Sequence, residues 1–226
     1  MGICQVDRPF GSSTKPLGTA QMNFFSVLDP RDPEVIMVEK WGRDSYLQKD
    51  GVTLWTWPKR RLSPIGGGEE PNDEIPEQTA LRELKEEGGL ERSLAEIHPH
   101  AKLMIPSRSH RAGSSGAVHS VHIFGIFTRE RPRLHPIDTW EIKEAKYMGL
   151  REDRLPPVVP NHVIVKDGDP RVMSPVHAER LADFLELTYT RATLVYGLGV
   201  ASSLLDTTVQ HLRDRVAWAR AQAKPK

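Results

Sequence analysis

The chain has 226 residues, and its 38% hydrophobic and 27% charged content suits one large folded domain, or a domain with an appendage. Its net charge of +1 excludes a global electrostatic attraction to nucleic acid or to an acidic membrane, so any electrostatic function has to be local. Cys4 is the only cysteine, which excludes an internal disulfide framework and a cysteine-rich zinc site and is typical of a reducing compartment.

The sequence offers no segment for membrane insertion. The first residues, MGICQVDRPFG, lack the apolar stretch of a secretory signal peptide. The longest apolar stretch, at residues 194–205, is too short and too interrupted to span a bilayer. We therefore expect a cytoplasmic protein with no membrane partner and no specific nucleic-acid partner.

The first half of the chain is predicted to be mostly strand. Residues 24–28 and 35–41 are short apolar runs separated by the turn sequence DPRDPE. Residues 52–57 alternate as a third strand, which Pro58 is expected to end because proline cannot donate to a sheet. Residues 62–74 are rich in glycine and are predicted to form an irregular loop.

A helix is predicted from Pro76 to about Glu87. Proline at the first turn costs nothing, because that turn has no intrahelical partner for its N–H. Ala80, Leu81 and Leu84 form an apolar stripe along one side, and Gly88 and Gly89 supply the left-handed stop. Further strands are predicted later in the chain, at residues 101–105, 118–127 and 145–150.

The pattern changes after a proline-rich linker at residues 155–160. Ser174 and Pro175 are a helix start. Helical apolar spacing follows, most clearly where apolar residues recur every three or four positions at Leu205, Val209, Leu212 and Val216. We therefore predict an α/β domain over residues 1–160, with its core at about 20–160, and a helical extension over residues 174–226. The sequence leaves open whether these helices pack on the core or form a homodimer interface.

One face of the helix that begins at Pro76 is strongly acidic. Glu83, Glu86 and Glu87 stand at positions i, i+3 and i+4, which share a face of an α-helix. Like charges at this spacing cost stability unless a cation lies among them. Arg82 is one such cation, and a divalent metal ion is the other that we expect, because clustered carboxylates suit Mg²⁺ or Mn²⁺.

The acidic face is part of a longer pattern. Residues 68–90 read GEEPNDEIPEQTALRELKEEGGL and fill each fixed position of G-x5-E-x7-R-E-U-x-E-E-x-G-U, where U is aliphatic. The filled positions are Gly68, Glu74, Arg82, Glu83, Leu84, Glu86, Glu87, Gly89 and Leu90. This matches the Nudix box, and the chain resembles a Nudix hydrolase. The resemblance implies an α/β/α sandwich with a mixed sheet over residues 20–160.

The resemblance also implies a function. It indicates a Mg²⁺- or Mn²⁺-dependent pyrophosphohydrolase that cleaves a nucleoside diphosphate linked to another moiety. Glu86 and Glu87 would be metal ligands, Glu83 a ligand or the base that activates water, and the Gly68 carbonyl a further ligand. A metal in this position would neutralise the diphosphate and lower the pKa of a bound water.

Other box residues would support the site. Arg82 is counted with the catalytic group because it can orient a carboxylate, and Glu74 would help to hold the helix. Asp73 departs from the family pattern, in which glycine is frequent near the end of the loop. Family members differ over the base, and the downstream candidates here are Glu130, Glu141 and Glu144.

The residues just before the box are candidates for substrate binding. Lys59, Arg60 and Arg61 could grip phosphate, and Trp57 could stack on a base. Gly67 and Gly68 would let backbone N–H groups approach a phosphate next to the helix N-terminus. The alternative is a solvated turn whose aromatic side chains pack in the core.

The identity of the substrate is left open. ADP-ribose or a nucleotide sugar is favoured, because Pro106 follows Leu90 at a spacing associated with such substrates in the family. One alternative is a (deoxy)nucleoside triphosphate pyrophosphohydrolase that uses the same metal site. The other is a non-catalytic nucleotide-sensing module whose C-terminal helices contact a partner.

Overall fold

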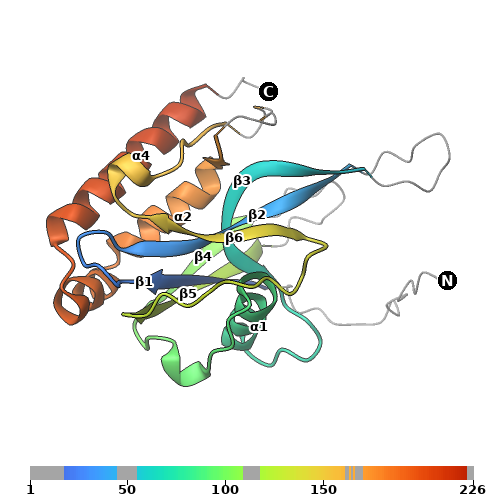
Figure 1. Cartoon of the computed structure of the whole chain (residues 1–226), viewed down its shortest axis with the longest axis horizontal. Helices are drawn as coiled ribbons and strands as arrows, with labels where there is room; N and C mark the ends of the chain where they lie inside the picture. The colour runs from blue at the N-terminus through green and yellow to red at the C-terminus, as the bar shows by residue number, and fades with distance from the viewer. Residues whose placement is uncertain are drawn as a thin grey trace.

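The computed structural model describes residues 18–44, 55–108, 118–160, 163, 165 and 170–222. The protein is a three-layer sandwich in which a mixed sheet lies between two layers of helices (Figure 1). Helix α1 (Pro76–Gly88) covers one face, and α2 (Pro175–Glu186) and α4 (Ser202–Ala221) cover the other. The predicted fold class, an α/β/α sandwich followed by C-terminal helices, is confirmed.

Within the described residues the sheet has seven strands, hydrogen-bonded in the order β4-β5-β1-β2-β3-β7, with β6 also paired to β2 and β1 to β3. The pairs β1–β5 and β3–β7 are parallel and the others are antiparallel. The strands are β1 (Thr19–Ser26), β2 (Glu34–Asp44), β3 (Trp55–Gly68), β4 (Lys102–Arg108), β5 (Val118–Thr128), β6 (Ile142–Gly149) and β7 (Val172–Met173).

Strand β2 supplies both apolar cores. Val35 and Met37 pack toward α2 and α4, whereas Ile36 and Val38 pack toward α1, because successive side chains of a strand point to opposite faces. Both sets are fully buried. The acidic helix α1 is therefore held against the sheet by a core of its own, on the face opposite the C-terminal helices.

Strand β3 is longer than predicted, and the expectation that Pro58 ends it was wrong. Pro58 lies inside the strand and pairs with Trp41, next to an irregularity in the β2–β3 register. A missing N–H is tolerated at such a point, because the hydrogen-bond ladder is already interrupted there. Residues 52–54, which belong to the predicted strand, lie outside the described residues.

The prediction of an irregular loop over residues 62–74 was also wrong in its first half. Residues up to Gly68 continue β3, and Gly66, Gly67 and Gly68 pair with Gln21, Ala20 and Thr19 of β1. A Cβ atom at Gly66 would lie 2.4 Å from the carbonyl oxygen of Ala20, so glycine lets the two strands approach closely. Strand β3 thus crosses from β2 to β1, and it delivers these glycines to the start of the α1 connection.

Helix α1 begins and ends close to the predicted residues. Pro76 stands in its first turn, and Gly89 ends it with a φ of 70° in the left-handed region. A Cβ atom at Gly89 would lie 2.0 Å from the carbonyl oxygen of His135, so glycine is required by space as well as by backbone angle. Ala80 and Leu84 are fully buried on the sheet side, as the apolar stripe predicted.

The predicted strands in the second half are confirmed as β4, β5 and β6, each longer than expected. The helix start at Ser174 is confirmed too, because the Ser174 hydroxyl accepts a hydrogen bond from the backbone N–H of His177. Short elements not predicted from the sequence are β7, α3 (Thr188–Ala192), the π-helical η3 (Thr193–Gly197), and the 3-10 turns η1 (Leu94–Glu96) and η2 (Glu152–Arg154).

The C-terminal helices pack on the sheet. Phe184 of α2 is fully buried and stacks on Phe25 of β1 at 6.0 Å between ring centroids. Leu205 and Leu212 of α4 belong to the same core as Val35. Packing on the sheet was one of the two arrangements that the sequence left open, and the homodimer stays a prediction.

In the described part of the chain, no helix combines the length and the apolar character needed to cross a membrane.

Candidate active site

The acidic face of α1 lies partly beneath the sheet. Glu83 and Glu87 are buried, at 8% and 2% exposed, whereas the side chain of Glu86 is 42% exposed. Burial raises the pKa of Glu83, although Arg82 favours its charged form. Burial also raises the pKa of Glu87, to about 7. The helix therefore places two carboxylates against the sheet and a third at the surface.

The glycines of β3 lie directly over these carboxylates. The N–H of Gly66 donates to Oε2 of Glu87 at 2.9 Å. A Cβ atom at Gly67 would lie 2.1 Å from Oε1 of Glu83, so any side chain at position 67 would displace this carboxylate. Gly68 has open space where a Cβ would stand. The sequence-predicted Gly67 and Gly68 are thus brought together with Glu83 and Glu87.

Arg82 connects the acidic face to the glycine strand. Its Nη1 lies 3.0 Å from Oε1 of Glu83 and 2.9 Å from Oε2 of Glu86. The pair with Glu86 is the one expected for helical residues four apart. Its Nη2 donates to the carbonyl oxygen of Gly68 at 2.8 Å. The guanidinium therefore fixes Glu83 and Glu86 relative to the carbonyl proposed as a metal ligand.

Asp73 anchors the same arginine, a role that the sequence did not predict. Its Oδ2 accepts hydrogen bonds from Arg82 at 3.2 Å, from the Thr79 hydroxyl at 3.0 Å and from the Glu70 N–H at 3.0 Å. Burial alone would raise the pKa of Asp73, but these hydrogen bonds hold it below its ordinary value. The side chain of Glu74, which was predicted to hold the helix, is exposed.

Lys40 of β2 is a second cation in the site. Its Nζ lies 2.5 Å from Oε1 of Glu87 and 2.7 Å from Oε1 of Glu141. Burial alone would lower the pKa of Lys40, but the two carboxylates outweigh it and raise the pKa, so the ammonium stays charged. The sequence signal was a lysine at the end of the apolar run VIMVEKW, whose partner could not be read from the sequence.

The segment before β6 fixes Glu141 next to α1. The N–H groups of Ile137 and Asp138 both donate to the carbonyl oxygen of Glu86, at 2.7 and 3.0 Å. Asp138 in turn accepts the N–H of Glu141 at 3.1 Å. The free carbonyl at the C-terminal end of the acidic helix thus orders the loop that carries a predicted base.

The other two candidate bases lie elsewhere. Glu130 is 3.5 Å from Arg92, and Glu144 forms an ion pair with Arg171 on the face toward α2. Arg171 also binds Glu39, which is fully buried and neighbours Lys40 in sequence. Of the three candidates, Glu141 alone reaches the box carboxylates, through Lys40.

The predicted phosphate-binding residues are only partly described. Arg61 donates to the carbonyl oxygens of Pro160 and Val163, at 3.0 and 2.7 Å, and burial lowers its pKa. These bonds connect β3 to the segment that follows η2. The side chains of Trp57, Lys59 and Arg60 lie outside the described residues, so their roles stay predictions.

The donor chemistry of this site suits a divalent cation. The available ligands are carboxylate oxygens and a backbone carbonyl, the hard donors that Mg²⁺ and Mn²⁺ prefer. Burial is the main cause of the raised pKa values of Glu83 and Glu87, so a divalent cation next to them would favour their ionised forms. Among the described residues, no three acidic or histidine side chains are grouped so that they could hold one metal ion. The carboxylates face Arg82 and Lys40 instead.

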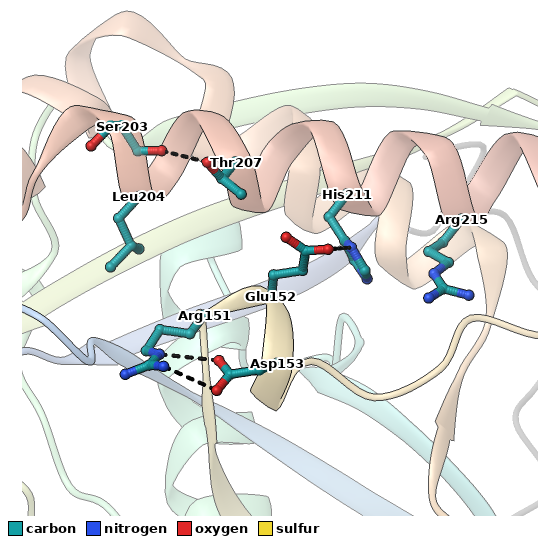
Figure 2. Close-up of a pocket in the computed structure, with 8 residues that line it drawn as sticks. All are labelled: Arg151, Glu152, Asp153, Ser203, Leu204, Thr207, His211 and Arg215. Atoms are coloured by element: carbon teal, nitrogen blue, oxygen red, sulfur yellow. Dashed lines mark hydrogen bonds and ion pairs between the residues drawn. The ribbon is translucent and has the colours of Figure 1, made fainter.

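A groove of about 680 Å³ lies elsewhere, between η2 and α4 (Figure 2). Ser203, Thr207, His211 and Arg215 form a row along α4, and His211 contacts Glu152 at 3.0 Å. Helix α4 covers the sheet face opposite α1 (Figure 1), so this groove is separate from the acidic site.

A family model for the NUDIX domain matches residues 21–165, which is more than half of the chain. The chain therefore belongs to the Nudix family. It is a pyrophosphohydrolase, a hydrolase that acts on phosphorus-containing acid anhydrides. The resemblance drawn from residues 68–90 is confirmed. Members of this family generally use divalent metal ions.

Solved structures of Nudix proteins are similar to this chain. A MutT/nudix family protein from Enterococcus faecalis is 14% identical, with a TM-score of 0.52 over 96% of this chain and 80% of that one. The NUDIX domain of Shewanella oneidensis NrtR, complexed with ADP ribose, is 15% identical, with a TM-score of 0.41 over 90% of each chain. At 14% identity, the likeness to the Enterococcus faecalis protein shows the fold alone. The search of curated proteins found no match.

Proposed function

We propose that the protein is a Mg²⁺- or Mn²⁺-dependent pyrophosphohydrolase that cleaves a nucleoside diphosphate linked to another moiety, with ADP-ribose or a nucleotide sugar as the preferred class. The observation that carries this proposal is the position of Glu83 and Glu87 directly beneath Gly66 and Gly67. These carboxylates face strand β3, and the chain leads from that strand to the N-terminus of α1. Helix N-termini are places where phosphate binds.

The proposed metal ligands are Glu83, Glu86 and Glu87 with the carbonyl oxygen of Gly68. A bound divalent ion would neutralise the diphosphate and lower the pKa of a water molecule. Arg82 supports this role, because it already holds Glu83 and Glu86 next to the Gly68 carbonyl. Removal of the guanidinium would leave these carboxylates free to repel one another.

We assign proton abstraction to Glu141 in preference to Glu130 and Glu144. Glu141 is the one candidate of the three that contacts the box carboxylates through Lys40, and its side chain is 49% exposed. A base has to reach the proton of the attacking water, and a half-exposed carboxylate at the rim of the site meets that condition. Glu83, which is buried beneath Gly67, is better suited to ligation.

Substrate recognition is proposed for the start of β3. Trp57, Lys59, Arg60 and Arg61 precede the glycines on the same strand, so the chain leads directly from them to the acidic site. Cationic side chains there would bind the phosphate groups, and Trp57 would stack on the base. Gly67 and Gly68 complete this set, because Gly67 lies against the Glu83 carboxylate and the carbonyl oxygen of Gly68 accepts a hydrogen bond from Arg82.

The organisation of the chain is part of the proposal. Residues 1–160 would form the catalytic domain, and residues 174–226 a helical extension that stabilises it through the core shared by α2, α4 and the sheet. A cytoplasmic location is supported by the single cysteine.

A panel of substrates tests this function. ADP-ribose, nucleotide sugars and nucleoside triphosphates are each incubated with Mg²⁺ and with Mn²⁺, and the products are separated by chromatography. Nucleoside monophosphate with a sugar phosphate is the expected product pair. Monophosphate with pyrophosphate would indicate the triphosphate activity instead. Binding of nucleotides without turnover of any of them would contradict the proposed catalysis.

A further inference from the structure

Lys40 contacts a carboxylate that the proposed function assigns to the metal ion. We propose that Lys40 is a tethered counter-ion that occupies Glu87 in the metal-free protein, and that the divalent ion has to displace it. This inference rests on the proposed function, because it assumes that Glu87 is a metal ligand. It goes further by identifying what the metal competes with.

Both oxygens of Glu87 are engaged in the structure. Oε2 accepts the N–H of Gly66 at 2.9 Å, and Oε1 lies 2.5 Å from the ammonium of Lys40. Glu87 is 2% exposed, so water has little access to either oxygen. An incoming cation would therefore compete with these two partners for the carboxylate, since neither oxygen is open to solvent.

The two partners of Glu87 differ in how easily they can leave. Gly66 belongs to the β1–β3 ladder, where it pairs with Gln21, so its N–H cannot move without the strand. Lys40 ends a flexible four-carbon side chain. We therefore expect the exchange to take place at Oε1, with Lys40 as the group that is displaced.

A displaced ammonium has a second carboxylate to hold it. Nζ of Lys40 is already 2.7 Å from Oε1 of Glu141, whose backbone is fixed by Asp138. Lys40 can thus leave Glu87 while it stays paired at the rim of the site. This arrangement keeps the cost of displacement low, because the charge does not have to be buried alone.

The charge of Lys40 has opposite effects on the stability of the metal-free protein and on metal affinity. In the metal-free protein Lys40 stabilises a buried carboxylate that would otherwise lack a cation. When a divalent ion binds, the ammonium and the ion repel each other over a distance of a few ångströms. Removal of the lysine charge should therefore weaken the metal-free fold and strengthen metal binding, and a structural salt bridge alone would give only the first effect.

The test is Mn²⁺ binding to the metal-free protein, measured by electron paramagnetic resonance without substrate. We expect Lys40→Met to bind Mn²⁺ at least tenfold more tightly than the wild type. The matched control is Lys143→Met, because Lys143 pairs with the buried Glu39 at 3.4 Å instead of with a box residue. That control should bind Mn²⁺ with wild-type affinity.

Equal or weaker Mn²⁺ binding by Lys40→Met would overturn the inference. If Lys40→Met does not fold, Lys40→Gln carries the same prediction with a polar side chain of similar length. Glu86→Gln in the same titration separates this inference from the proposed function. Its loss of Mn²⁺ binding, together with an unchanged affinity in Lys40→Met, would retain the metal site and reject the counter-ion. A wild-type protein that binds no Mn²⁺ would reject both.

Discussion

Gly67 lies against the carboxylate of Glu83, and a Cβ atom at position 67 would stand 2.1 Å from Oε1 of that glutamate. The contact joins the glycine strand to the acidic helix at the centre of the proposed site. It also makes the position of Glu83 depend on a residue that carries no side chain.

The first prediction concerns this contact. Gly67→Ala should displace the Glu83 carboxylate and lower kcat/KM by about 100-fold, which corresponds to about 3 kcal/mol of transition-state stabilisation. Steady-state kinetics on the best substrate of the panel measures the change. Gly68→Ala is the comparison variant, because nothing lies within 4 Å of a Cβ atom there and its carbonyl oxygen is kept, so its kcat/KM should fall much less than that of Gly67→Ala. Equal losses in both variants would contradict this account.

The second prediction separates Asp73 from Glu74. Asp73→Ala removes the acceptor for Arg82, Thr79 and the Glu70 N–H, and it should lower the free energy of unfolding by about 1–3 kcal/mol. Activity should fall as well, because Arg82 loses one of its anchors. Glu74→Gln changes an exposed side chain and should be close to neutral for stability. Urea unfolding compares the two, and a larger loss in Glu74→Gln would reverse the assignment.

The third prediction is a dependence of stability on pH. Burial, with Arg180 nearby, lowers the pKa of His177 to about 4, although a hydrogen bond to the Leu62 backbone opposes the shift. Histidine in the unfolded chain has a pKa of about 6.5. The buried neutral imidazole therefore contributes its full stability at pH values above 6.5, and this contribution is lost as the pH falls from about 6.5 to 4.

Urea unfolding at pH 7.5 and pH 5.0 measures this contribution. His177 alone should account for about 2 kcal/mol of the stability lost between these two values. In His177→Asn the loss should be smaller by about that amount, because asparagine does not titrate. The same loss in the variant and in the wild type would show that His177 is not the group responsible.

The fourth prediction tests whether the C-terminal helices belong to the fold. Phe184→Ala leaves a cavity between α2 and the sheet, and it should lower the free energy of unfolding by about 3–5 kcal/mol. Trp218→Ala on α4 is the control, because Trp218 is 52% exposed. Its effect should stay within about 0.5 kcal/mol. Similar stabilities for the two variants would point to an extension that packs elsewhere, for example in a homodimer.

Features with local determinants could be predicted from the sequence. Pro76 marks the start of α1 and Gly89 marks its end. Each residue acts on the backbone at its own position, so no distant partner has to be known. The spacing of Leu205, Val209, Leu212 and Val216 predicted the buried face of α4 in the same way. The pairing of Arg82 with Glu86 required only the geometry of one helix.

Features that depend on distant partners could not be predicted. The glycines at 66–68 count as strand only because β1 pairs with them, and that pairing cannot be inferred from a glycine-rich sequence. Lys40 and Glu141 lie far apart in the chain, and they meet because β2 and β6 are neighbours in the sheet. Asp73 was noted only as a departure from a pattern, because its role depends on the position of Arg82 in space.

The central claim is that the acidic face of α1 carries out metal-dependent hydrolysis, and Glu86→Gln tests it most directly. Glu86 is the most exposed of the three box glutamates, so its amide variant should keep the fold and the melting temperature. Formation of nucleoside monophosphate from the preferred substrate, measured with saturating Mg²⁺ or Mn²⁺, should fall at least about 100-fold. A folded Glu86→Gln protein with nearly the wild-type rate would contradict the account.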